Sequence, residues 1–265
     1  QPPHGAALKK AAPAKTVVTS GAKVVSQLEE SRPAPGMSLA DFLAQALGPR
    51  FHRRQEWAGR GRDFAPRPVR RRTWEPIGPV RAVTIHHASE VPDGPPARMI
   101  RTIYLGHTSV TWKLNAADVG YHFFVDRNGE VWEGRDATKM GTHVGSEPRR
   151  LNNAGNLGVC GLGTFLRQSP PKAMVDGIVN LCRLLSRYYG RPLGVRGHLD
   201  WIGVNRFFPY GGTDCPGRLE AAVKLARQEI ERIYRLTNAQ MEQQLETGEL
   251  HSRVAKADGK HGRKR

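Results

Sequence analysis

Short apolar runs alternate with amphipathic segments between residues 80 and 244, and this alternation is the feature that most constrains the fold. Residues 80–86 are rich in β-branched side chains, which predicts a buried strand. Residues 97–105 are a helix candidate. Two further strand-like runs, residues 120–126 and 130–133, flank Arg127-Asn128-Gly129, and Asn-Gly between such runs is a strong hairpin signal.

The second half of the chain continues the pattern. Residues 156–163 predict a strand that contains several glycines. Ser169-Pro170-Pro171 opens a long helix, and Gly190 caps it. A further helix is expected from about residue 218 to about residue 244. The sequence therefore predicts an α/β fold, with a single mixed central β-sheet flanked by helices, a basic N-terminal extension and a basic C-terminal tail.

The predicted domain boundaries follow the composition. Residues 1–72 are expected to be a basic, Pro-rich extension. Within it, a short amphipathic helix near residues 38–47 is predicted to dock on the main domain, and residues 49–72 are predicted to be a linker. Residues 73–235 are expected to form the folded domain, and residues 236–265 the end of a helix with a basic tail.

The formal net charge is +17, and most of it lies at the two ends. Residues 1–72 hold 14 Lys and Arg against 5 Asp and Glu, and residues 251–265 hold 6 against 1, whereas residues 73–250 hold 21 against 18. A nucleic-acid-binding domain carries its charge on the folded face that contacts the phosphates. The distribution disfavours a specific nucleic-acid partner and predicts salt-sensitive attraction of the flanks to an anionic surface.

Other classes are excluded by composition. The chain has no run of about 18 apolar residues, so no membrane-spanning helix is expected. Three cysteines cannot build a dense disulfide framework. Cys160 and Cys182 are predicted to be small buried side chains, and a disulfide between them stays open. The chain is expected to be a soluble monomer.

Residues with metal-binding chemistry lie at the ends of the predicted strands. His86 and His87 close the first strand, His198 follows the long helix, and Cys215 lies seventeen residues after His198. Two imidazoles and one thiolate suit zinc, and three protein ligands leave a fourth position for water. The sequence contains no GxGxxG, P-loop, CxxC or HExxH motif, which disfavours nucleotide sites and helix-borne zinc sites.

Three blocks in order resemble a known family: Val83-Thr84-Ile85-His86-His87-Ala88; Asp118-Val119-Gly120-Tyr121-His122-Phe123 with its continuation to Arg135; and Gly197-His198 with Thr213-Asp214-Cys215-Pro216-Gly217. Between them, Gly141-Thr142-His143-Val144-Gly145 and Asn156-Leu157-Gly158-Val159-Cys160 also match. Together they are similar to the zinc N-acetylmuramoyl-L-alanine amidases that certain phage lysozymes share with peptidoglycan-recognition proteins. The resemblance covers roughly residues 73–235.

The resemblance implies that one zinc ion is held by His86, His198 and Cys215. Alternation along a strand puts His86 on the smaller, more polar face and His87 on the more apolar one, which favours His86 as the ligand without deciding between the two. Asp214 is an alternative carboxylate ligand, since related amidases use aspartate near this position. The segment 201–212, between His198 and Cys215, is longer than in relatives, and it could form the rim of a peptide groove.

The resemblance also implies the remaining site residues. Tyr121 and Thr213 match the catalytic positions, where a tyrosine orients water or the substrate carbonyl and a threonine offers a hydroxyl hydrogen bond. His143 matches a histidine that lines the groove and is predicted to contact the substrate, as is His87 beside it. No residue is assigned as the proton donor.

The implied activity is hydrolysis of the amide between N-acetylmuramic acid and L-alanine in peptidoglycan. The alternative is a module that binds muropeptides without cleaving them, although such relatives typically lack a metal ligand. The implied partners are peptidoglycan or muropeptides, with the basic flanks on the anionic cell wall. Given that substrate and a first residue other than Met, the protein is expected to be exported to the periplasm, the cell envelope or the medium.

Overall fold

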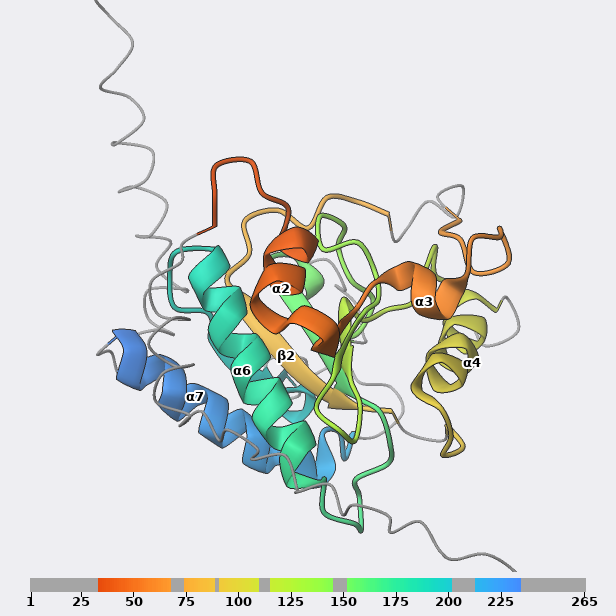
Figure 1. The fold of residues 1–265 in the computed structure, drawn as a ribbon. Coiled ribbons are helices and arrows are strands. Elements are labelled where there is room, and N and C mark those ends of the chain that lie inside the picture. The colour runs from red at the N-terminus through yellow and green to blue at the C-terminus, as the bar shows by residue number, and fades with distance from the viewer. Residues whose placement is uncertain are drawn as a thin grey trace, which may run out of the picture. The chain divides into compact units, whose positions relative to one another are not determined.

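A computed structural model describes residues 33–67, 74–88, 91–109, 115–144, 152–201 and 213–234. Their centre is a six-stranded sheet with the strand order β1-β4-β3-β5-β2-β6 (Figure 1). Strands β3, β5, β2 and β6 run parallel, and β4 is antiparallel to β3 and parallel to β1. The strands are β1 (Phe51–His52), β2 (Ala82–His87), β3 (Phe123–Val125), β4 (Val131–Glu133), β5 (Asn156–Gly161) and β6 (Gly194–Gly197). The mixed sheet flanked by helices confirms the predicted fold class.

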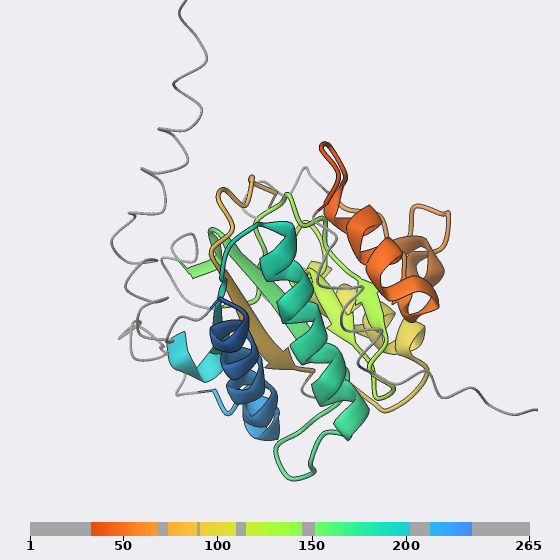
Figure 2. The same cartoon turned by 60° about the vertical axis from the view of Figure 1, so that its left-hand side comes forward.

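One face of the sheet is covered by α2 (Leu39–Leu47), α6 (Lys172–Tyr188) and α7 (Glu220–Tyr234). Helices α6 and α7 lie side by side across β2, and α2 lies beside α6 on the same face (Figures 1 and 2). The core between them is mostly aliphatic, with four phenylalanines among its buried side chains. It includes Leu43, Val83, Ile85, Leu157, Val159, Ile178, Leu181 and Ile230, each fully buried.

The opposite face carries α4 (Pro96–Thr108) and α3 (Arg54–Ala58), which pack against each other. Its core is richer in aromatic side chains and consists of Trp57, Ile100, Tyr104, Phe124, Trp132 and Cys160 with their neighbours. Cys160 belongs to this cluster and Cys182 to the aliphatic one on the other face. Both are free thiols, so the disulfide left open by the sequence does not form.

Most predicted elements are present. Strands β3 and β4 pair as the predicted hairpin, and Gly129 in its turn has a φ of +76°, a conformation that favours glycine. Helix α4 extends the predicted segment by a few residues, α6 lies within the predicted one, and the helix expected near residues 38–47 is α2. Its N-cap Ser38 accepts a hydrogen bond from the backbone of Asp41. The last predicted helix is α7, and residues 235–244 lie outside the described residues.

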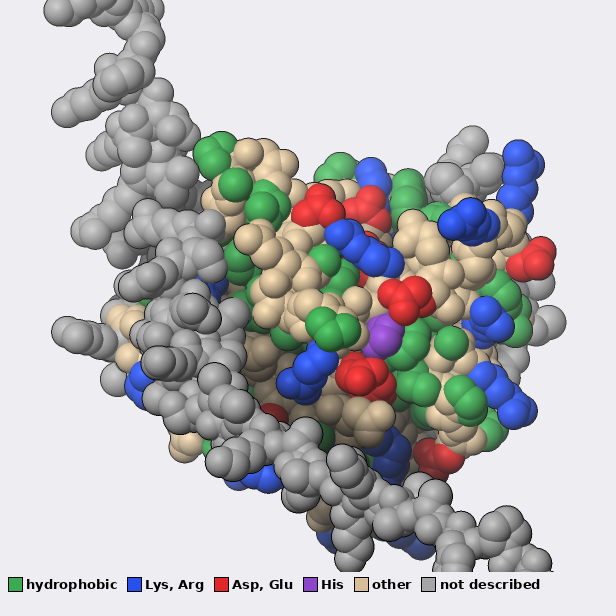
Figure 3. Space-filling model, in the orientation of Figure 1, with side chains coloured by type: hydrophobic (Ala, Val, Ile, Leu, Met, Phe, Trp, Pro, Cys, Tyr) green, Lys and Arg blue, Asp and Glu red, His purple; other side chains and the backbone are tan. Residues whose placement is uncertain are grey.

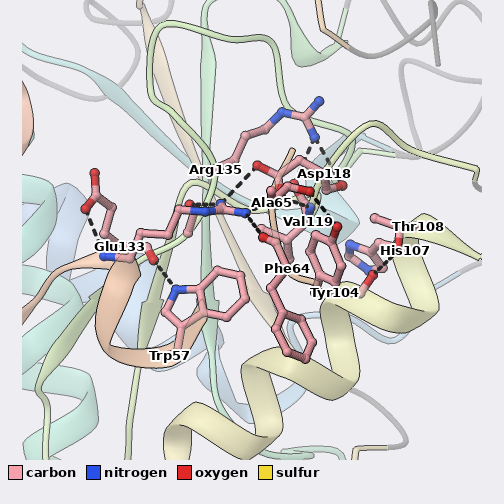
Figure 4. Close-up of polar contacts among 12 residues, drawn as sticks. Trp57, Phe64, Ala65, Tyr104, His107, Thr108, Asp118, Val119, Glu133 and Arg135 are labelled. Carbon is pink, nitrogen blue, oxygen red and sulfur yellow. Dashed lines mark hydrogen bonds and ion pairs between the residues drawn. The ribbon is translucent and has the colours of Figure 1, made fainter. Parts of the chain in front are cut away.

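The predicted linker over residues 49–72 is wrong for its first part. Phe51 and His52 extend the sheet along β4, and α3 follows at once. Trp57 of α3 is fully buried and donates from Nε1 to the Glu133 carbonyl (Figure 4). Arg54 makes a two-point ion pair with the buried Asp118, at 2.8 and 3.0 Å. These long-range partners fix an Arg-rich segment that composition alone suggests is loose.

The described residues also form short 3₁₀ turns: η1 (Gly48–Arg50) leads into β1, η2 (His198–Trp201) follows β6, and η3 (Gly217–Leu219) leads into α7. Acidic and basic side chains are interspersed on the face of Figure 3, in line with the near balance of charge in residues 73–250. Residues 1–32 and 235–265 lie outside the described residues. Within the described part, no helix is long and apolar enough to cross a bilayer.

Candidate metal centre

The strand β2 places its two terminal histidines on opposite faces of the sheet. Val83 and Ile85 pack in the aliphatic core, and the alternation of side chains therefore turns His86 toward the face of α4. His86 meets the ring of Tyr121 there, at 5.0 Å between centroids. His87 points the other way, and its Nδ1 accepts the backbone N–H of Phe165.

His86, His198 and Cys215 come together although the sequence separates them by up to 129 residues. One potential ligand atom from each lies within 4.8 Å of the other two. The Sγ of Cys215 is 3.7 Å from Nδ1 of His86, and the ring centroids of His86 and His198 are 4.6 Å apart. The elements responsible are β2, the turn η2 directly after β6, and the loop before η3. Asp214 is not part of this group.

The donor set fits a zinc ion. Nε2 of His198 is buried and has no hydrogen-bond partner, which is costly unless the site supplies one. Two imidazole nitrogens and a thiolate are the ligands that zinc favours. The backbone N–H of His87 donates to Sγ of Cys215 at 3.4 Å, a contact that stabilises negative charge on sulfur.

Burial sets the protonation of the three side chains. It lowers the pKa of His198 to about 4 and holds the pKa of His86 well below its usual value, so both imidazoles are neutral near pH 7 and each keeps one lone pair for a metal. Burial also raises the pKa of the Cys215 thiol to about 12. In these surroundings the thiol loses its proton near pH 7 only when a cation binds the sulfur and stabilises the thiolate.

Tyr121 and Thr213 lie next to these residues. Tyr121 precedes β3, packs against His86 and is partly buried; burial keeps the pKa of its phenol well above 10, so it retains its proton. Thr213 Oγ1 accepts the backbone N–H of Cys215 at 3.2 Å, which ties the hydroxyl to the loop that carries the thiol. A hydroxyl that accepts one hydrogen bond still has its own O–H to donate.

His143 differs from a groove-lining side chain. It is buried, and both ring nitrogens contact protein atoms: Nδ1 is 3.0 Å from Nε2 of His86, and Nε2 is 3.1 Å from the carbonyl of Asn156. His87 is also buried. The sequence predicts that both residues contact the substrate. In the structure, both ring nitrogens of His143 and Nδ1 of His87 contact protein atoms. In the long segment after His198, Trp201 donates to Thr84, and residues 202–212 lie outside the described residues.

Sequence reasoning missed His107. This side chain continues the buried stripe of α4 formed by Ile100, Ile103 and Tyr104. Its Nδ1 accepts the backbone N–H of Gly120, and the centroid of its ring lies 5.3 Å from that of Tyr121. A histidine on an otherwise apolar helical stripe is the signal that could have identified it.

The same region ties Tyr121 to the N-terminal segment. Asp118, three residues before Tyr121, forms the ion pair with Arg54, and Arg135 donates a hydrogen bond to the Val119 carbonyl (Figure 4). Tyr104 donates to the carbonyl of Ala65 beyond α3 (Figure 4). The segment 54–65 therefore buttresses the loop that presents Tyr121.

Comparison with known proteins gives the family. Residues 76–218, more than half of the chain, match the sequence pattern of the N-acetylmuramoyl-L-alanine amidases. The chain belongs to this amidase family. The predicted resemblance is thereby confirmed at the level of the family.

Individual relatives match over shorter stretches. Peptidoglycan-recognition protein SD of Drosophila simulans is 36% identical over 69 residues, which are 26% of this chain and 34% of the relative. An endolysin of Klebsiella phage KP32 is 35% identical over 74 residues, or 28% of this chain and 43% of the endolysin. The chain thus spans less than half the length of these two relatives.

A solved structure supports the fold. The crystal structure of Drosophila peptidoglycan recognition protein SD aligns with a TM-score of 0.50 and 23% identity, covering 67% of this chain and 93% of the fly protein. At this identity the likeness bears on the arrangement of sheet and helices only.

Proposed function

We propose that this amidase-family chain is a zinc-dependent hydrolase of peptidoglycan, which cleaves the amide between N-acetylmuramic acid and the L-alanine of the stem peptide. The observation that carries the proposal is the group of His86, His198 and Cys215, with their ligand atoms within 4.8 Å of one another in a chain of this family. The relatives named above as an endolysin and a peptidoglycan-recognition protein support peptidoglycan as the ligand.

Zinc, when bound, supplies a Lewis acid that lowers the pKa of water toward 7 and polarises an amide carbonyl. His86, His198 and Cys215 would hold it; His86 and Cys215 are buried, and His198 is partly buried. Burial of the ligands strengthens the charge interactions that develop on the substrate during attack on the carbonyl carbon.

Tyr121 is the proposed catalytic partner of the metal. Its phenol is neutral, and its ring packs on that of His86, so its O–H can donate a hydrogen bond beside the ligands. Donation to the substrate carbonyl oxygen would stabilise the negative charge that this oxygen gains in the transition state. Thr213, tied to the backbone of Cys215, is proposed to assist with a second hydroxyl donor.

The flanks are proposed to concentrate the enzyme on its polymer. They carry most of the net charge of +17, and the cell wall is anionic. Attraction of this kind is long-ranged, non-specific and screened by salt. We propose further that the protein acts outside the cytoplasm, where this substrate lies.

Digestion of purified peptidoglycan by the zinc-loaded protein tests the function. Mass spectrometry should detect released stem peptides with a free N-terminal alanine and glycan strands with intact lactyl groups. A chelator should abolish release and added zinc restore it. Tyr121→Phe should retain zinc and lower the turnover number with little change in metal content, because it removes one hydroxyl. Binding of muropeptides without release of peptide from any wall preparation would favour the recognition module instead.

A further inference from the structure

His143 forms a chain of hydrogen bonds that ends at a metal ligand. It lies in the segment between β4 and β5, 57 residues from His86 in sequence. Its Nε2 contacts the Asn156 carbonyl at 3.1 Å, and its Nδ1 contacts Nε2 of His86 at 3.0 Å. Both rings are buried, so water does not compete for these nitrogens.

The carbonyl fixes the direction of every proton in the chain. A carbonyl oxygen can only accept, so Nε2 of His143 must carry its proton and donate it. A neutral imidazole has one N–H, so Nδ1 of His143 accepts and Nε2 of His86 donates to it. His86 is then left with a bare lone pair on Nδ1, the atom that faces Sγ of Cys215 at 3.7 Å.

The surroundings hold the His143 ring in place. The side chain of Asn153 accepts the backbone N–H groups of His143 and Val144 and donates to the Val144 carbonyl, which fixes this segment. Gly158 of β5 leaves room for the ring, because a Cβ at this position would come within 2.6 Å of its Cγ and Cδ2. The two glycine-containing blocks around His143 and Gly158 are thus packed against each other.

We propose that His143 is a positioning residue that holds His86 as the Nε2–H tautomer, with Nδ1 aimed at the metal. Because its ring is already oriented, His86 loses less orientational freedom on binding the ion. The hydrogen bond to His143 also makes Nδ1 of His86 a stronger electron-pair donor to the metal. This role replaces the substrate contact that the family resemblance implies for His143. It rests on the proposed function only for the identity of the ion.

The first test needs no metal. Two-bond ¹⁵N–¹H correlation spectra of the metal-free, ¹⁵N-histidine-labelled protein report which ring nitrogen is protonated. The expected result is the Nε2–H tautomer for both His86 and His143. A protonated Nδ1 on His86, or a mixture of its two tautomers, in the wild-type protein would overturn the proposal whatever the protein does to peptidoglycan.

The second test is zinc affinity, measured by competition with a chelator. His143→Leu removes the acceptor and should weaken zinc binding by about 10–100-fold, the usual effect of removing a ligand's hydrogen-bond partner. His143→Asn places an oxygen near the position of Nδ1 and should recover part of the loss. Gly158→Ala should also weaken zinc binding, because the added methyl displaces the ring without changing its chemistry.

His122→Gln is the matched control. His122 is equally buried and also bonded at both nitrogens, to the Gly158 N–H and the Lys139 carbonyl, but it does not contact His86 through either nitrogen. This variant should lose stability with little change in zinc affinity. Equal zinc affinity of the wild type and folded His143→Leu would contradict the role of His143 and leave the proposed function standing. A wild-type protein that binds no zinc would refute the zinc assignment, and the tautomer measurement would then decide the role of His143.

Discussion

The two faces of the sheet are packed by different kinds of contact. Under α6 and α7 the contacts are mostly aliphatic and non-directional, and they stabilise the fold through the apolar area that they remove from water. On the α4 face, histidines, a thiol and an aspartate are buried with directional partners. Burying such groups costs free energy unless every partner is in place. The first face therefore provides stability, and the second holds a reactive geometry at some cost in stability.

The largest expected effect comes from removing residues 1–72. This truncation deletes α2, β1 and α3, and with them the fully buried Leu43 and Trp57. Loss of one such side chain costs about 2–5 kcal/mol, and the sum approaches the whole stability of a typical domain. We expect thermal melting and circular dichroism to show an unfolded or barely stable protein. Removal of residues 1–32 alone, which spares α2, β1 and α3, is the control that isolates the contribution of these three elements.

A core cavity on the aliphatic face should lower stability without altering the site. Leu181→Ala on α6 removes a fully buried side chain and should cost about 2–5 kcal/mol in denaturant unfolding. Zinc bound per folded protein should stay at the wild-type value. A marked loss of zinc from the folded variant would show that the two faces are not independent.

Acid should destabilise the metal-free protein through its buried histidines. Burial lowers the pKa of His122 to about 4 in the folded state, against the ordinary histidine value of 6.5 in the unfolded chain. The unfolded chain therefore binds more protons between pH 6.5 and 4, and stability falls as the pH falls through that window. This one side chain accounts for up to about 3 kcal/mol. Unfolding curves at several pH values, with a chelator present, should show a weaker slope for His122→Gln.

The smallest effects should come from the two cysteines that bind no metal in this account. Cys182→Ala on the aliphatic face and Cys160→Ala beside the site each leave a small cavity, at a cost of about 1 kcal/mol. Both variants should keep full zinc content. Loss of zinc from Cys160→Ala alone would bring that thiol into the metal centre.

Local pattern predicted the elements whose own sequence carries a regular period or a turn signal. The β2 strand, the β3–β4 hairpin and α6 follow from alternation, an Asn-Gly turn and helical spacing within a few residues. The alternation along β2 also anticipated that His86 and His87 face opposite sides. The two-residue β1 and the five-residue α3 have no such period, and they form because Arg54 and Trp57 meet partners more than 60 residues away.

Within the site, too, the sequence did not predict contacts that depend on long-range packing. Ordered motifs identified His86, His198 and Cys215, and the structure brings them together. They could not show that His143 uses both nitrogens on protein atoms, because that depends on the packing of Gly158 and the path of the backbone at Asn156. His107 was missed because a single histidine on the apolar stripe of α4 belongs to no motif.

The metal content of Cys215→Ala tests the central claim most directly. The account predicts a folded protein, since Cys215 lies in a loop before η3, with most of its zinc and its peptide-releasing activity lost, while Cys160→Ala under the same conditions retains both. Stoichiometric zinc and normal release of stem peptide by Cys215→Ala would contradict the account and make Asp214 the ligand to examine.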